Sequence, residues 1–94
     1  MTRAHDPVGE SVRTEINRLA HRWHSLPVGH ARSAGVLARE VAAEWLGEPL
    51  PDLGPATALD QLRVAVYEQA RSGADDTVLG ERLAQLRRAV NDAT

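Results

Sequence analysis

The stretch that decides the fold is residues 28–47, which reads VGHARSAGVLAREVAAEWLG. Two seams run through it side by side at helical spacing, one of small residues and one of larger residues. The small seam is Ala31, Gly35, Ala38 and Ala42, and the larger seam is Ala34, Leu37, Val41 and Trp45. Because nothing larger than a methyl group projects from the small seam, a partner helix can approach it closely. We therefore predict a helix over 28–46, ended by Gly47, and expect it to be the most buried helix.

Three further segments share the helical period, and none shows the alternation of a β-strand. They span residues 7–25, 56–72 and 76–91, and breaks rich in Pro and Gly separate them. Their main apolar stripes are Val12, Ile16, Leu19 and Trp23 in the first, Leu59, Leu62, Val66 and Ala70 in the second, and Leu79, Leu83, Leu86 and Val90 in the third. The sequence thus predicts a mainly α protein: one domain over residues 1–94, built as a small four-helix bundle, either up-and-down or an orthogonal array.

The links between the helices indicate how they connect. Asp6 is placed to cap the first helix. The first and third links are short, so helices 7–25 and 28–46 are expected to be antiparallel neighbours, and so are helices 56–72 and 76–91. The middle link is rich in proline and has about eight residues. Fully extended, it could span roughly 25 Å, which fits either an adjacent or a crossover connection.

Composition and charge exclude several functions. The chain has 94 residues, of which 43% are hydrophobic and 26% charged, as is ordinary for a globular domain. No apolar run approaches the length of a membrane span, and no signal-peptide pattern is present. The absence of cysteine excludes thiolate chemistry, and a net charge of −2 gives no general attraction to nucleic acid or to an anionic membrane. We therefore expect a soluble, cytoplasmic protein that binds neither nucleic acid nor membrane.

The basic residues are unusual, because all 11 of them are Arg and Lys is absent. This bias is typical of a high-GC bacterial genome, so it does not by itself indicate phosphate recognition. The absence of Lys excludes catalysis through a lysine Schiff base or a lysine general base.

The histidines are the first residues to consider for metal binding. His21 and His24 lie one helical turn apart, and His30 follows the next break. A metal site needs a third or fourth ligand, and the cationic Arg13 and Arg22 nearby would repel a divalent ion. We expect His21 and His24 to be solvated and His30 to be partly buried and neutral. No metal and no cofactor are predicted.

Catalytic motifs are equally scarce. No serine lies in a Gly-x-Ser-x-Gly elbow, and there is no Gly-rich phosphate loop. Arg18 and His24 are similar to the Arg-x(4–6)-His pattern of a family of helical ribonucleases, but roughly 1.4 such matches are expected by chance here. Residues 79–89 resemble the first helix of Cro/repressor-type domains, although the segment that reads DNA has no counterpart. We predict no catalytic residue.

The tripeptide Trp45-Leu46-Gly47 resembles the WXG-type helical-hairpin proteins that specialised secretion systems of high-GC bacteria export. The resemblance covers these three residues and the overall length, and it implies one long hairpin with Trp45 at its tip. Three features depart from the family pattern. Pro27 and Gly29 interrupt what would be the first long helix, and three prolines follow where a tight turn belongs. Tyr67 is followed four residues later by Arg71 instead of an acid.

Some apolar residues remain outside the predicted core. They are Val36 and Val64 on outward helix faces, and Leu50 and Leu53 in the middle link. The two leucines could close one end of the bundle, or all four could form a surface for a protein partner or for self-association. We therefore predict a non-catalytic helical protein–protein interaction module. The alternatives are a WXG-type exported protein and a small helical enzyme without a recognisable motif.

Overall fold

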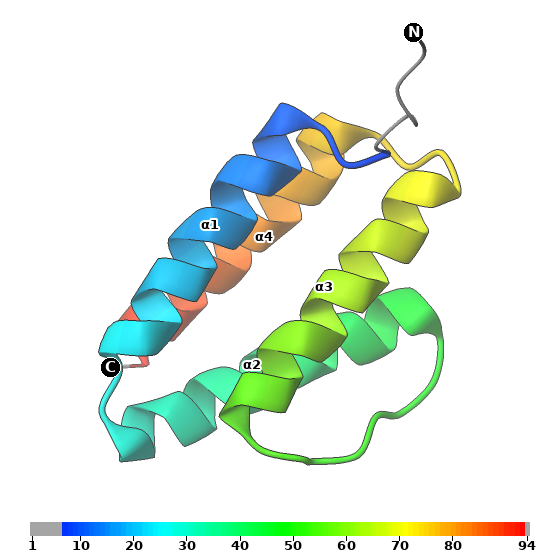
Figure 1. Cartoon of the computed structure of the whole chain (residues 1–94). Coiled ribbons are helices and arrows are strands. Elements are labelled where there is room, and N and C mark those ends of the chain that lie inside the picture. The colour runs from blue at the N-terminus through cyan, green and yellow to red at the C-terminus, as the bar shows by residue number, and fades with distance from the viewer. Residues whose placement is uncertain (1–6, 94) are drawn as a thin grey trace, which may run out of the picture.

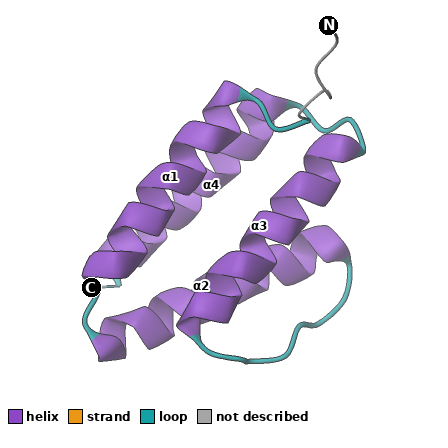
Figure 2. Ribbon diagram, in the orientation of Figure 1, coloured by secondary structure: helices purple, strands orange, loops and turns teal. Residues whose placement is uncertain are grey.

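The computed structural model describes residues 7–93 and contains, over this range, four α-helices and no strand (Figures 1 and 2). The helices are α1 (Glu10–Ser25), α2 (Val28–Leu46), α3 (Pro55–Arg71) and α4 (Asp76–Asp92). The predicted fold class, a mainly α four-helix bundle, is confirmed. α1 begins three residues later than predicted, and the other ends agree to within one residue. The predicted cap Asp6 lies outside the described residues.

The helices are arranged as two pairs, α1 with α4 and α2 with α3 (Figure 1). The expectation that helices joined by short links would be the main neighbours is therefore wrong. α1 and α2 contact each other only weakly, and α3 and α4 hardly more. The short link between α1 and α2 holds their ends together, but the two helices diverge from there (Figure 1). Burial of the apolar faces, and not link length, selects the pairs.

The two helices of the α1–α4 pair run in the same direction. Ser11 and Asp76 meet at their starts, and near their ends Arg22 Nε donates a 3.0 Å hydrogen bond to Asn91 Oδ1. Parallel neighbours bring like dipole ends together. The Asp76 carboxylate offsets this at the N-termini, because it accepts hydrogen bonds from the backbone N–H groups of Ser11 (2.9 Å) and Val12 (3.3 Å). α4 thus caps α1, whose own N-cap residue is a glycine.

The α2–α3 pair is also parallel. Pro55, at the start of α3, lies against Gly35 in the middle of α2. Near the two helix ends, Gln69 Nε2 donates a 2.8 Å hydrogen bond to the carbonyl oxygen of Trp45. The link of residues 47–54 must therefore return along α2, as Figure 1 shows. Of the two connections that its length allowed, the structure has the crossover.

Contacts along α2 and α3 hold the crossover link in place. Arg39 of α2 forms a 3.1 Å ion pair with Asp52 of the link. Gln61 of α3 donates a 3.2 Å hydrogen bond to the carbonyl oxygen of Pro51. Gly47 begins the link with a φ of 75°, a left-handed conformation that favours glycine, and so ends α2 where the sequence predicts.

The small seam of α2 supports close packing, as predicted. Gly35 lies against Pro55 and Ala58 of α3, and Ala38 and Ala42, further along the seam, are fully buried. The expectation that α2 would be the most buried helix is wrong, because α4 has six buried residues and α2 has five. The reason lies in the first turns of α2, residues 28–33, in which no residue is buried.

Gly80 marks the closest approach of α4 to α1. A Cβ added at Gly80 would lie 2.8 Å from Cβ of Ser11 and 3.2 Å from its carbonyl carbon, so the backbone of α1 would have to shift. Although Ala has the higher helix propensity, we expect Gly80→Ala to destabilise the fold by about 1–2 kcal/mol through overpacking. Urea denaturation measures this change.

Gly29→Ala is the matched control for Gly80→Ala. Gly29 also lies in a helix, but an added Cβ would meet nothing within 4 Å. Because Gly29 lies in the first turn of α2, this variant should be unchanged or stabilised by up to about 0.5 kcal/mol. If both variants were stabilised equally, α1 and α4 would not meet at Gly80.

Candidate functional site

The structure leaves three of the four predicted surface residues exposed. The exposed fractions are 39% for Val36, 64% for Leu53 and 56% for Val64. Leu50 is half-buried and packs against the core. Val36 lines a shallow hollow together with the two link residues that flank Leu53, Asp52 and Gly54. Val64 lies on α3 and does not line this hollow.

Val64 has an exposed neighbour that the sequence analysis missed. Tyr67, one turn further along α3, is 46% exposed. Asp60 lies one turn before Val64 and Arg71 lies one turn after Tyr67, and both are exposed. The spacings of four, three and four residues place these side chains on one face of the helix. We call Asp60, Val64, Tyr67 and Arg71 the α3 seam.

Neighbouring residues on α3 position the charged ends of the seam. Arg63 Nη1 lies 3.4 Å from Asp60 Oδ1, and Arg71 Nη2 lies 2.8 Å from Glu68 Oε2. The hydrogen bond and the charge of Glu68 raise the pKa of the Arg71 guanidinium above its ordinary value. The seam therefore has an apolar centre, a negative end and a positive end.

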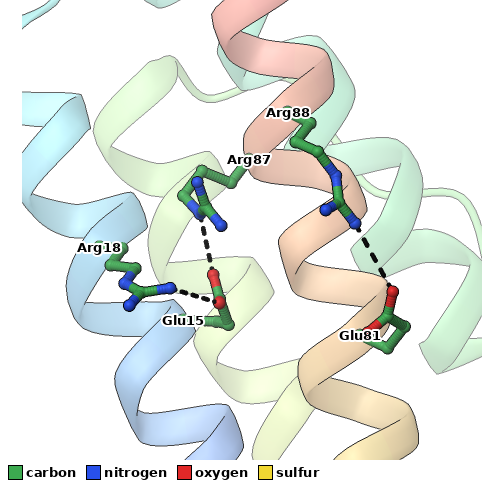
Figure 3. A network of polar contacts seen from close by, with 5 residues as sticks. All are labelled: Glu15, Arg18, Glu81, Arg87 and Arg88. Carbon is green, nitrogen blue, oxygen red and sulfur yellow. Dashed lines mark hydrogen bonds and ion pairs between the residues drawn. The ribbon is translucent and has the colours of Figure 1, made fainter.

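Glu15 is the buried charged residue of the described chain, and it joins α1 to α4 (Figure 3). Its carboxylate accepts hydrogen bonds from Arg18 at 3.0 Å and from Arg87 at 2.9 Å. The pairing with Arg18 is local to α1, whereas α4 supplies Arg87. Because both carboxylate oxygens have a guanidinium partner, Glu15 has a structural role and is poorly placed to act as a base.

Two hollows of opposite charge lie along the α1–α4 groove. Glu10, Glu15, Asp76 and Glu81 line the hollow near the helix starts, whereas Arg18, His21, Arg22 and Arg87 line the one nearer the ends. Acidic groups favour helix N-termini and basic groups favour C-termini. The parallel arrangement strengthens both preferences, because the two N-termini lie side by side at one end and the two C-termini at the other. Compensation of the helix dipoles accounts for Glu10 and Asp76 in the first turns of α1 and α4 and for Arg22 in the last turn of α1.

The hollow where α1, α2 and α3 meet comes nearest to an active site in its chemistry. Trp23 and Leu59 provide apolar walls, and the polar lining residues are His24, Asp60 and Arg63. Asp60 and Arg63 are paired with each other, and Trp23 Nε1 donates a 2.8 Å hydrogen bond to the carbonyl oxygen of Pro55. No Ser, Thr, Cys, Tyr or Lys lines this hollow. It therefore offers an imidazole and a carboxylate, but no hydroxyl, thiol or amine nucleophile.

The three histidines between residues 7 and 93 lie on the surface. His21 and His24 are exposed, as predicted. His30 is exposed too, which corrects the expectation that it is partly buried, because it lies in the first turns of α2. Within residues 7–93, no three His, Cys, Asp or Glu side chains gather closely enough to hold a metal ion.

Comparisons with protein-family models, with curated proteins and with solved structures give no match. The resemblance to WXG-type proteins stays confined to the tripeptide. Trp45 is half-buried against the core of a four-helix arrangement, and the chain after Gly47 returns along α2 in a crossover. None of the helices between residues 7 and 93 is long and apolar enough to cross a membrane.

Proposed function

We propose that this protein is a non-catalytic helical interaction module that binds a protein partner on the α3 seam. The observation that carries the proposal is the pairing of Val64 and Tyr67, which are adjacent and about half exposed, with a charge at each end of the seam. Protein interfaces have an apolar centre with a polar rim, and tyrosine is enriched in them. The linear shape of the seam suits a helix laid alongside α3.

The two alternative functions have less support. A WXG-type exported protein requires a long unbroken hairpin with Trp45 at its tip, whereas here α2 is followed by a crossover link. A small helical enzyme would use the hollow beside His24, in which the acid and the arginine are paired with each other. On the α3 seam, two exposed apolar side chains lie next to each other on one helix face, with a charged residue on either side.

The proposal also includes the class of partner and the cellular location of the module. Its partner is a protein and not nucleic acid, which agrees with the net charge of −2. We place it in the cytoplasm of a high-GC bacterium, in line with a composition that uses Arg for all 11 basic residues. Val36 and Leu53 are exposed as well, and Val36 lines a hollow with the link residues on either side of Leu53.

A capture experiment with two matched variants tests the proposed function. Val64 is 56% exposed on the seam, and Val78 is 66% exposed near the start of α4, outside the seam. Tagged native protein and the variants Val64→Asp and Val78→Asp are used as bait in lysate of the source cells, and captured proteins are identified by mass spectrometry. We expect a partner that the native protein and Val78→Asp retain and Val64→Asp loses. Equal capture by both variants would overturn the proposal, and so would the absence of specific capture by a native chain that also stays monomeric at high concentration.

A further inference from the structure

The α3 seam is complementary to itself when it is read in the opposite direction. Its four positions, 60, 64, 67 and 71, are placed symmetrically about the midpoint between residues 65 and 66. If a second α3 lies antiparallel about this point, Asp60 meets Arg71 of the second copy, and Val64 meets Tyr67 of the second copy. Each acid then faces a base, and each apolar residue faces an apolar residue.

The spacing of the seam fits helix-on-helix packing in this orientation. Intervals of four, three and four residues are those of the seam positions in a coiled coil. A parallel alignment in register would instead place Asp60 beside Asp60 and Arg71 beside Arg71, which like-charge repulsion disfavours. Charge therefore selects the antiparallel alignment. Since each copy presents the same patch, the arrangement is an isologous two-fold interface that closes as a dimer.

We propose that the partner on the α3 seam is a second copy of this chain, bound antiparallel about the midpoint between residues 65 and 66. This inference rests on the proposed function and names its partner. The intramolecular pairs Asp60–Arg63 and Glu68–Arg71 remain in place, so each end of the interface becomes a row of alternating charges. The order along the row is Arg63, Asp60, then Arg71 and Glu68 of the second copy. Val64 and Tyr67 are covered at the centre.

The size of the surface indicates a weak dimer. One seam of about three helical turns buries less than the roughly 1,200 Å² typical of stable interfaces. We expect a dissociation constant on the order of 100 µM, with exchange between monomer and dimer. Because the ion pairs at both ends of the seam are exposed, added salt should weaken the dimer.

Charge reversal at the two ends of the seam tests the proposal by sedimentation equilibrium between about 10 µM and 1 mM protein. In Arg71→Asp, both ends of the antiparallel interface join like charges, and we expect the dissociation constant to rise by about ten-fold or more. Asp60→Arg should have the same effect. A 1:1 mixture of the two variants restores opposite charges at both ends and should form a heterodimer. The double variant Asp60→Arg/Arg71→Asp should dimerise again.

Arg88→Asp is the matched control for these charge reversals. Arg88 is an exposed arginine of α4 that pairs with Glu81 and lies outside the seam, so its reversal should leave the dissociation constant unchanged. Circular dichroism melts confirm that each variant is folded. Heterodimer formation in the 1:1 mixture is a second check, because two misfolded variants would not form a heterodimer. Dimerisation that Arg71→Asp leaves intact, or a mixture that stays monomeric while the native chain dimerises, would overturn the proposed interface.

The two proposals fail in different ways. If the native chain stays monomeric up to 1 mM but a Val64-dependent partner is captured from lysate, the second copy is the wrong partner and the interaction module stands. If the chain is monomeric and no capture depends on Val64, both proposals are wrong.

Discussion

Trp23→Ala is expected to lower the free energy of unfolding by about 3–5 kcal/mol. Trp23 lies near the end of α1, is only 8% exposed, and belongs to the core. Its Nε1 also donates a 2.8 Å hydrogen bond to the carbonyl oxygen of Pro55, at the start of α3. Because α1 and α3 belong to different helix pairs, this side chain helps to connect the two pairs. Truncation to alanine removes the buried ring, leaves a cavity and breaks the hydrogen bond.

Trp23→Phe separates the packing of the ring from the hydrogen bond. Phenylalanine keeps an aromatic ring in the core but has no N–H to donate to Pro55. We expect the free energy of unfolding of this variant to fall by about 1–2 kcal/mol. A typical hydrogen bond contributes about 1 kcal/mol, and the smaller ring fills the site less well. Urea denaturation of both variants gives the comparison. If Trp23→Ala lowers the free energy of unfolding no more than Trp23→Phe does, packing of the indole ring between α1 and α3 does not stabilise the fold.

Ala38→Leu is expected to destabilise the protein by at least about 2 kcal/mol. Ala38 is fully buried on the small seam of α2. Nearby on the same seam, a Cβ added to Gly35 would lie only 3.2 Å from Cα of Pro55, which shows how closely α3 approaches. The three additional carbon atoms of leucine have no free volume there, so α3 would have to move away or the side chain would adopt a strained rotamer.

Ala89→Leu is the control for this substitution. Ala89 also lies inside a helix, but it is exposed on α4, so the same change should alter stability by no more than about 0.5 kcal/mol. Chemical denaturation of the two variants measures the difference. Equal stability of Ala38→Leu and Ala89→Leu would contradict close packing of α2 against α3.

Most of the local structure could be predicted from the residues themselves. The α2 boundaries follow from the break at Pro27 and from Gly47, and the apolar stripes of all four helices supply most of the core. Helix starts were less predictable. α1 begins at Glu10, where the Asp76 carboxylate caps it, and residue 76 lies far away in the sequence. A rule that considers only the residues next to a helix start cannot predict a cap supplied by a residue so distant in the sequence.

The candidate site could be predicted in part. Val64 was recognised because it falls outside the apolar stripe of its helix. Tyr67 falls outside the same stripe, which runs through Leu59, Leu62 and Val66. It lies three residues after Val64, and this helical spacing could have identified it as an exposed neighbour of Val64. Leu50 could not be assigned from sequence, because whether a link residue covers a bundle end depends on where the link runs.

By itself, the sequence determined that residues 7–93 form four helices, which seam of each is apolar, and that α2 presents a small face for close packing. These properties depend on interactions within about four residues, where helical period, Gly and Pro dominate. Only the tertiary structure decided that α1 pairs with α4 and α2 with α3, each in parallel, and that the middle link is a crossover. Link lengths permit several arrangements, and the choice among them depends on which apolar faces bury one another across the whole chain.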